Sequence, residues 1–318
     1  MKTKKATGRQ SVQGSPKVSP LYVQRILATT DFSKESLAGV KMATALAEKL
    51  KAGVTLLHVV EPPARLAGLE SLLLVRDEAG VMAQMRSKVT ALSESERKGK
   101  VTISSAVRTG KPFHEISTAA TELEADMIVM ATHGHSGAKR VLMGSTAERV
   151  VRHAPCPVLT IPTRKTREQR GKASGLNLKK ILVPVDFSEI SGKALPWAAY
   201  LAAQFEAELI LLYVVDRSAI SYLLGSELMS HAVMPFIKQS EVDLAGMARK
   251  LSDSSVVKVS AVVLEGTPYE VICHAAESMS ADLIVLTTHG HTGLKHAWLG
   301  STAERVVRQA YCAVLTVR

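Results

Sequence analysis

Apolar positions along this chain alternate between short continuous runs and longer amphipathic stretches. Runs such as 54–60 are apolar almost throughout, which is typical of strands that are buried on both faces of a sheet. The stretch after Ser33 instead places small and apolar residues at helical spacing as far as Leu50. For the first half, this pattern predicts strands at 25–30, 54–60, 101–108, 126–131 and 157–161, and helices at 33–50, 70–98, 112–123 and 145–153.

The second half repeats this alternation. It predicts strands at 180–185, 208–215, 256–264, 282–287 and 313–317, and helices at 189–206, 225–253, 268–279 and 301–309. Apolar strands separated by helices indicate a parallel sheet covered on both faces, and right-handed crossovers make it doubly wound. We therefore predict an α/β protein with two tandem doubly wound, Rossmann-like domains, each a five-stranded parallel sheet flanked by helices.

A duplication supports the two-domain interpretation. The nine residues from Gly144 to Arg152 recur unchanged from Gly300 to Arg308, an offset of 156 residues. Asp31 to Ser33 recurs at Asp186 to Ser188, an offset of 155. A period this long indicates tandem whole domains and not a solenoid of small repeats. We place a basic disordered tail at 1–20, the first domain at 21–162, a basic linker at 163–179 and the second domain at 180–318.

The net charge of +11 first suggests a nucleic-acid partner. However, the tail and the segment 163–180 account for the whole excess, so the domain bodies are close to neutral. Aromatic residues make up only 4% of the chain, which argues against a base-stacking platform. We interpret the two basic segments as solvated. A weak electrostatic contact of these segments with RNA, DNA or anionic lipid is the alternative.

The cysteines and the apolar runs bear on the compartment. Cys156, Cys273 and Cys312 are an odd, scattered set, which indicates reduced thiols that serve in packing. No apolar run reaches the length of about 18 residues that a membrane span needs. The first 20 residues lack the apolar segment of a secretory signal. We therefore expect a cytoplasmic protein without a membrane partner.

A glycine loop follows the fourth predicted strand of each half. Gly134 comes soon after the strand, and Gly144-Ser145 opens a helix after nine intervening residues. Ser145 and Glu148 have the spacing of a capping box, with Ser145 as the N-cap. Free amides at a helix start form an anion site, so the loop is a candidate phosphate site. The alternative is that these glycines only permit a tight turn.

The aspartate at the end of the first strand is the second candidate. Asp31 and its counterpart Asp186 would lie at the carboxyl edge beside the glycine loop. A carboxylate there could accept hydrogen bonds from ribose hydroxyls or an adenine amino group. The spacing equally allows an aspartate that only N-caps the following helix.

These motifs resemble the universal stress protein family, in its tandem form. The family pattern is Gly-x2-Gly-x9-Gly-(Ser/Thr) after the fourth strand, with an aspartate after the first. The resemblance covers about 25–161 and 180–317. It implies ATP or AMP, with or without Mg²⁺, at the strand switch point. By this resemblance the binding residues are Asp31, Val59, Ala131, Gly134, Gly144, Ser145 and Thr146 in the first half, and Pro184, Asp186, Val214, Thr287, Gly290, Gly300, Ser301 and Thr302 in the second.

Two departures from the family pattern concern these sites. Its first glycine is replaced by Ala131 in one half and by the bulkier, β-branched Thr287 in the other. The proline that often precedes the aspartate is present as Pro184, whereas the first half has Thr29. We therefore expect the first site to hold nucleotide more readily than the second.

The leading hypothesis is a stress-response protein that binds adenine nucleotide and acts as a regulatory sensor. Alternatives are a slow ATPase, for which no catalytic residue is identifiable, and a nucleotide-free interaction module. A metal held by His133 and His135, or by His289 and His291, is a weaker alternative because no further ligand has a fixed spacing. The final strands of the halves could pair as an intramolecular pseudo-dimer, and a homodimer stays open.

Overall fold

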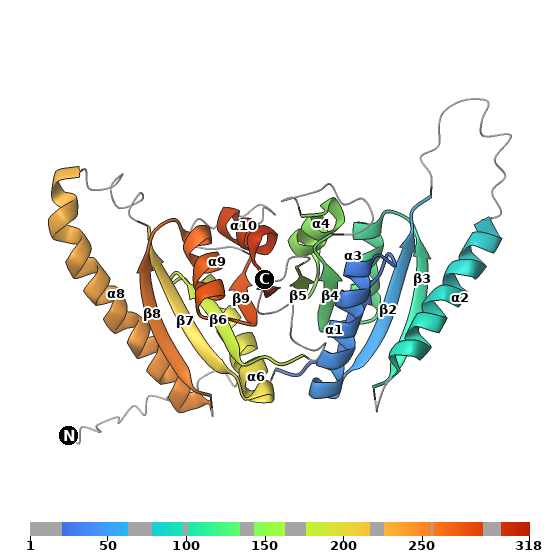
Figure 1. Ribbon diagram of the computed structural model, residues 1–318, viewed down its shortest axis with the longest axis horizontal. Coiled ribbons are helices and arrows are strands. Elements are labelled where there is room, and N and C mark those ends of the chain that lie inside the picture. The colour runs from blue at the N-terminus through green and yellow to red at the C-terminus, as the bar shows by residue number, and fades with distance from the viewer. Residues whose placement is uncertain are drawn as a thin grey trace, which may run out of the picture.

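The computed structural model describes residues 21–62, 78–97, 101–133, 143–162, 176–216, 226–255, 257–288 and 300–318 (Figure 1). The first half contains β1 (Arg25–Thr29), α1 (Lys34–Leu50), β2 (Gly53–Val60), α2 (Glu78–Glu96), β3 (Ile103–Thr109), α3 (Pro112–Glu122), β4 (Met127–Ala131), α4 (Ser145–His153) and β5 (Val158–Ile161). The second contains β6 (Lys180–Val185), α5 (Glu189–Gly192), α6 (Ala194–Phe205), β7 (Glu208–Val215), α8 (Ser226–Ser254), β8 (Val259–Glu265), α9 (Pro268–Ser278), β9 (Leu283–Thr287), α10 (Ser301–Gln309) and β10 (Ala313–Val317).

Within the described residues, the strands of both halves form one sheet of ten strands in the order β3-β2-β1-β4-β5-β10-β9-β6-β7-β8. Pairing within each half is parallel, whereas β5 and β10 pair antiparallel at the centre. Two threonines support this seam, because Thr160 Oγ1 donates to the Val314 carbonyl and Thr316 Oγ1 donates to the Val158 carbonyl, each at 3.1 Å. The predicted fold class is confirmed, and the final strands cover each other's edges within one chain.

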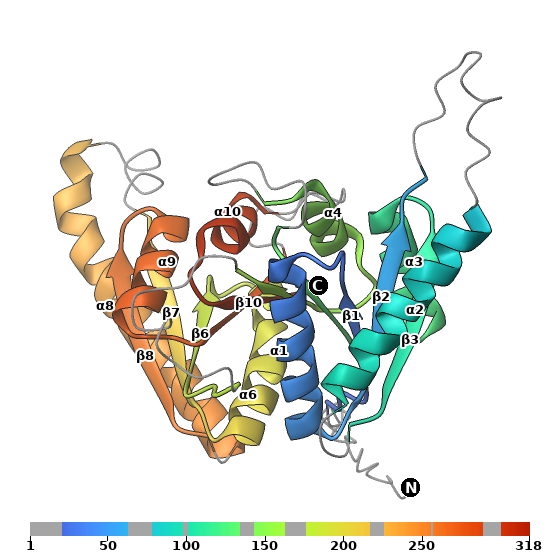
Figure 2. The ribbon, with the colours of Figure 1, turned by 45° about the vertical axis from the view of Figure 1, so that its right-hand side comes forward.

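Helices cover both faces of the sheet (Figures 1 and 2). The helices α1, α2, α6 and α8 bury one apolar layer, which includes Val40, Val89 and Leu201. On the other face, α3, α4, α9 and α10 bury a second layer, which includes Ile116, Val150 and Val306. Within the described ranges, no helix is both long and apolar enough to cross a bilayer.

One predicted helix is divided in the structure. The sequence pattern favours a single helix at 189–206, but the chain forms the short α5, a break at Lys193 and then α6. Pro196 explains the break, because it lacks the N–H that would bond to the carbonyl of Gly192 and its ring would clash with that carbonyl. The helix expected at 70–98 is described as α2 from Glu78, and 63–77 lie outside the described residues.

Candidate functional site

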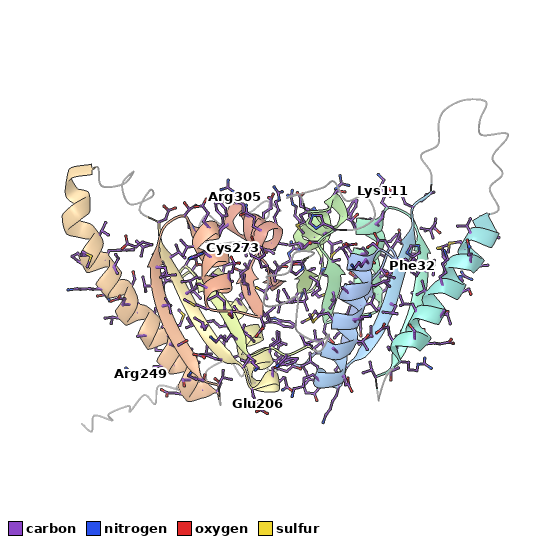
Figure 3. The ribbon with its side chains drawn as sticks, viewed as in Figure 1. Phe32, Lys111, Glu206, Arg249, Cys273 and Arg305 are labelled. Atoms are coloured by element: carbon purple, nitrogen blue, oxygen red, sulfur yellow. The ribbon has the colours of Figure 1, made fainter. Side chains whose placement is uncertain are left out.

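Each half of the sheet reverses its strand order between its first and fourth strands. In the order β3-β2-β1-β4-β5, β1 is followed in the chain by β2 on one side and lies beside β4 on the other. The chain connections from these two strands leave in opposite directions, and in doubly wound sheets the carboxyl ends at such a switch point are where ligands bind. Phe32 and Lys111 lie toward this edge, and Glu206 lies at the opposite edge (Figure 3).

In the first half, a tight turn joins β1 to α1. Ser33 is the N-cap, because its side chain accepts a hydrogen bond from the Ser36 N–H at 3.1 Å. Asp31 Oδ1 in turn accepts from the Ser33 N–H at 2.9 Å, and Phe32 adopts φ 65°. The alternative in which Asp31 caps the helix is therefore wrong, because the turn places Ser33 there.

The second half builds the same turn, and its aspartate also accepts a hydrogen bond from the serine hydroxyl. Ser188 caps α5 by accepting from the Ser191 N–H at 3.0 Å, and Phe187 adopts φ 61°. Asp186 Oδ1 accepts from the Ser188 N–H at 3.0 Å and also from its hydroxyl at 2.5 Å. Both aspartates are thus fixed at the carboxyl edge, next to the point where β4 or β9 ends.

The glycine loop returns to this edge through one backbone hydrogen bond. The Gly144 N–H donates to the Thr132 carbonyl at 2.8 Å, and the Gly300 N–H donates to the Thr288 carbonyl at 2.7 Å. A Cβ at Gly144 would lie only 3.2 Å from the Thr132 carbonyl oxygen, so this approach favours glycine. Each bond therefore brings a helix start beside the end of the fourth strand of its half.

The predicted capping boxes are wrong in both halves. Gly144 and Gly300 are the N-caps of α4 and α10, and neither helix start has a side-chain cap within the described residues. Glu148 instead pairs with Arg152 at 2.8 Å, and Glu304 pairs with Arg308 at 2.7 Å. The reason is that the glycine amide is held by the strand end, which makes the glycine the last residue before the helix. The serine hydroxyls are consequently not used as caps.

The remaining predicted site residues lie along the same edge. Ala131 and Thr287 are the last residues of β4 and β9, and both are 9% exposed. Ser145 and Ser301 are exposed at the first helical positions, followed by the half-buried Thr146 and Thr302. Val59, Val214 and Pro184 lie near the carboxyl ends of β2, β7 and β6. Gly134 and Gly290 lie outside the described residues, as do His135, His289 and His291.

Sequence reasoning missed an aromatic pair beside each aspartate. Phe32 packs on His58 with ring centroids 4.8 Å apart, and Phe187 packs on Tyr213 at 4.6 Å. Phe236 of α8 adds a third ring, 6.4 Å from Tyr213. Burial, and then the charge of Asp186, raise the pKa of Tyr213. The available signals were the repeat of Asp-Phe-Ser and the string Leu-Leu-x-Val-Val that β2 and β7 share, in which His58 and Tyr213 occupy the one position that differs.

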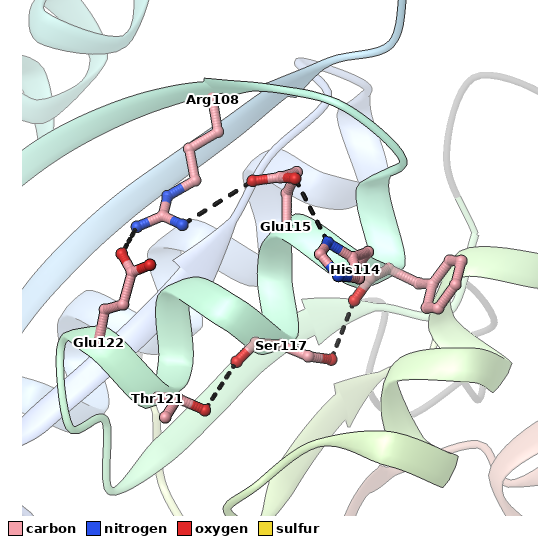
Figure 4. A network of polar contacts seen from close by, with 7 residues as sticks. Arg108, His114, Glu115, Ser117, Thr121 and Glu122 are labelled. Carbon is pink, nitrogen blue, oxygen red and sulfur yellow. Dashed lines mark hydrogen bonds and ion pairs between the residues drawn. The ribbon is translucent and has the colours of Figure 1, made fainter.

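A charged network also lies beside the first site. Arg108 pairs with Glu122, and its Nη1 lies 3.8 Å from Glu115 Oε2 (Figure 4). Arg108 is the direct cross-strand neighbour of Val59. Glu115 packs over Gly110, which adopts φ 151° and where a Cβ would lie 2.7 Å from Glu115 Oε1. The corresponding residues of the second half are apolar or neutral, namely Leu264, Val271 and Ser278.

The three cysteines are free and partly or fully buried. Burial raises the pKa of the Cys156 and Cys312 thiols to about 12 and that of Cys273 to about 11. Thiols with such pKa values stay protonated near neutral pH and are poor nucleophiles. The structure therefore supports a role in packing for the three cysteines.

The fold and the repeated edge define a tandem α/β protein with one strand switch point in each half. The family model of the universal stress protein family matches residues 23–162 and 177–318, so the chain belongs to the universal stress protein family. The chain is 38% identical over 146 residues to a universal stress protein of Methanocaldococcus jannaschii, covering 46% of this chain and 85% of that protein.

Two further similarities extend over nearly the whole chain. A universal stress protein of Mycolicibacterium smegmatis is 27% identical over 303 residues, which covers 92% of this chain and 96% of that protein. A solved universal stress protein from Archaeoglobus fulgidus covers 94% of this chain and 98% of its own, with 20% identity and a TM-score of 0.67. This second similarity supports the fold alone.

Proposed function

We propose that the protein binds adenine nucleotide, ATP or AMP, at the carboxyl edge of one or both halves and acts as a regulatory sensor of that ligand. The observation that carries the proposal is the hydrogen bond from the Gly144 N–H to the Thr132 carbonyl at 2.8 Å. It sets the start of α4, which has no side-chain cap among the described residues, at the switch point that Asp31 also borders.

The chemistry of this edge fits a nucleotide. The first-turn amides of a helix are donors without an intrahelical acceptor, and the helix dipole favours an anion there. Ser145 adds an exposed hydroxyl at the first helical position. Asp31 offers a carboxylate for sugar or base, with its Oδ1 already fixed by Ser33. Ser145 and Thr146 would hold phosphate, and Gly300, Ser301 and Thr302 would do so in the second half.

The backbone of β2 can meet the base. Val59 lies on β2, the strand that pairs with β1, at a level beyond the last residue of β1. Asp31 follows β1 closely in the chain. Val214 has the same place on β7 in the second half. A Mg²⁺ ion would enter with the phosphates, because Mg²⁺ is usually held by one or two carboxylates plus phosphate oxygens. No group of three or more potential ligand side chains occurs among the described residues.

The test begins with the small molecules that denaturation of purified protein releases, identified by chromatography and mass spectrometry. Titration calorimetry with ATP and AMP follows, on the wild type and on Asp31→Asn and Asp186→Asn. Each substitution keeps the acceptor for the serine amide and removes the charge, so the fold should persist while binding at that site weakens about tenfold or more. Glu206→Gln removes a carboxylate charge at the opposite edge and should leave binding unchanged.

Each outcome decides between the candidate functions. Adenine nucleotide near one or two equivalents, together with an association state that changes with ATP, supports the sensor. Steady phosphate release that falls with Asp31→Asn would instead indicate the slow ATPase. No released nucleotide and no binding at millimolar ATP would overturn the proposal and leave an interaction module.

A further inference from the structure

The ladder between the first two strands ends earlier in the first half than in the second. The last pair of β1 and β2 is Thr29 with Leu57, whereas that of β6 and β7 is Val185 with Tyr213. In the repeat, Thr29 corresponds to Pro184, so the second ladder is one pair longer. Thr30, the counterpart of Val185, lies outside the strand. This difference lies at the edge where the proposed base-binding backbone begins.

Backbone hydrogen bonds show which way Val59 points. The Gly53 N–H donates to the Gln24 carbonyl, and the Leu57 carbonyl accepts from the Thr30 N–H at 2.9 Å. The Val54 N–H and the Val60 carbonyl bond on the opposite side, to Thr102 and Gly110. Because backbone groups alternate along a strand, the N–H and the carbonyl of Val59 both face the β1 side. β1 has ended at that level, so these two groups face the strand switch point and not a residue of a paired strand.

A histidine side chain is bonded to the carbonyl that Val59 would use in a continued ladder. In a continued parallel ladder, the Thr30 carbonyl would accept the Val59 N–H. Instead, His58 Nδ1 lies 2.8 Å from that carbonyl oxygen. A carbonyl only accepts, so Nδ1 carries the hydrogen. Within the described residues, no hydrogen bond joins the Val59 N–H to an acceptor. The ring is held in place by Phe32, 4.8 Å away between centroids.

The second half has no equivalent arrangement. Tyr213 stands at the position of His58 and packs between the rings of Phe187 and Phe236. With Val185 paired, the ladder continues past the point where the first one stops. The Val214 N–H is thus directed at the Val185 carbonyl, as a regular parallel ladder requires. The two sites therefore present different backbone donors to a base.

We propose that His58 is a positioning residue that keeps the Val59 N–H available and so makes the first half selective for adenine over guanine, a selectivity that the second half lacks. This inference rests on the proposed function. An N–H and a carbonyl that face the same way complement the ring N1 acceptor and the 6-amino donor of adenine. Guanine presents N1–H and O6, the reverse order, which would leave buried polar groups mismatched.

The test compares the full-length wild type with His58→Phe, which keeps the ring on Phe32 but removes the donor. Hydrogen exchange of the Val59 amide, followed by NMR without nucleotide, should be fast in the wild type and at least about tenfold slower in His58→Phe, because the Thr30 carbonyl becomes free to accept it. Calorimetry with ATP and GTP should show a first-site preference for ATP that falls about tenfold in the variant. Tyr213→Phe is the matched control and should change neither quantity.

The outcomes separate the inference from the function on which it rests. If ATP binds and its preference over GTP survives in His58→Phe, the inference is overturned and the proposed function stands. A Val59 amide that is already protected in the ligand-free wild type also overturns the inference. If neither nucleotide binds the wild type, both fail. His58→Asn, which restores a short donor, should recover part of the preference, and recovery excludes a merely structural loss.

Discussion

The two halves of this protein have nearly the same backbone but different side chains at the edge where a ligand would bind. The serine caps of α1 and α5, the glycine N-caps of α4 and α10 and the positive φ angles of Phe32 and Phe187 occur in both. Beside them, His58 of the first half is replaced by Tyr213 in the second, and Arg108 is replaced by Leu264. Duplication has thus preserved the backbone of this edge, whereas the residues that would select a ligand have diverged.

This contrast shows which residues the fold constrains. Gly110 and Gly266 adopt φ 151° and 137°, where a side chain would be strained, so both halves need glycine there. The residue that packs over the glycine is free to differ, and it is Glu115 in one half and Val271 in the other. A shared backbone therefore supports two chemically different sites, and substitutions that exchange residues between halves test this directly.

The largest expected effect comes from moving the first half's arginine into the second. Leu264→Arg removes an apolar side chain from the layer under α9 and adds a charge where the partners of Arg108 are replaced by Val271 and Ser278. We expect the free energy of unfolding to fall by about 2 to 3 kcal/mol, measured by urea denaturation. Adding Val271→Glu and Ser278→Glu should recover part of the loss. No loss in the single variant would show that this layer tolerates charge.

Almost all of the fold could be predicted from the sequence, because the strands are buried on both faces and each hydrophobic pattern occurs in both halves. The helix at Ser145 to His153 and the strands at 180–185 and 313–317 have the predicted bounds. The predicted helix at 189–206 was wrong because Pro196 lies inside a stretch with a helical pattern. Helix propensity alone did not show that the first helix would end before the proline, which lies in the first turn of α6.

The candidate site was harder to predict than the fold. Asp31 and Gly144 carry local motifs, so their place at the carboxyl edge followed from the strand order. The capping box was misassigned because the Gly144 N–H donates to the Thr132 carbonyl at the strand end. Residue spacing does not reveal this hydrogen bond. His58 could not be singled out, because its role depends on the register of β1 against β2. The binding roles of these residues stay predictions.

The next effect concerns pH, since the second half has two thiols that are partly or fully buried and the first half has one. Burial raises the pKa of Cys312 from 9.0 to about 12, so the folded state retains the thiol proton to a higher pH than the unfolded state. Stability from this group is complete below pH 9 and falls as pH rises toward 12. Between about pH 8.5 and 10.5, Cys312→Ala should lose about 2 kcal/mol less than the wild type, measured by urea denaturation at each pH.

Cys156→Ala provides the comparison in the first half, where the pKa of the thiol is also raised to about 12. The two variants should therefore reduce the pH dependence equally, while Cys273→Ala has a similar effect that is complete by about pH 11. An unchanged pH dependence in all three would contradict the burial of these thiols.

A smaller effect is expected at the two helix caps. Ser33→Ala removes one side-chain cap and should cost about 1 kcal/mol. Ser188→Ala removes a cap and also the hydroxyl that donates to Asp186 Oδ1 at 2.5 Å, so it should cost about 2 kcal/mol. Chemical denaturation gives both values. Equal costs would mean that the short hydrogen bond to Asp186 adds nothing to the cap, and Thr at either position should retain most of the stability.

The smallest effect tests a contact that the halves share with different rings. The Arg149 guanidinium lies 5.0 Å from the centroid of Phe113, and that of Arg305 lies 4.8 Å from the centroid of Tyr269. Arg149→Ala and Arg305→Ala should each cost about 0.5 kcal/mol, because exposed cation–π contacts are weak. Tyr269→Phe makes the second pair identical to the first and should change stability less than either. A clearly larger loss for Arg305→Ala would show that the tyrosine hydroxyl, which donates to Glu270 at 2.7 Å, strengthens the second contact and that the halves differ here too.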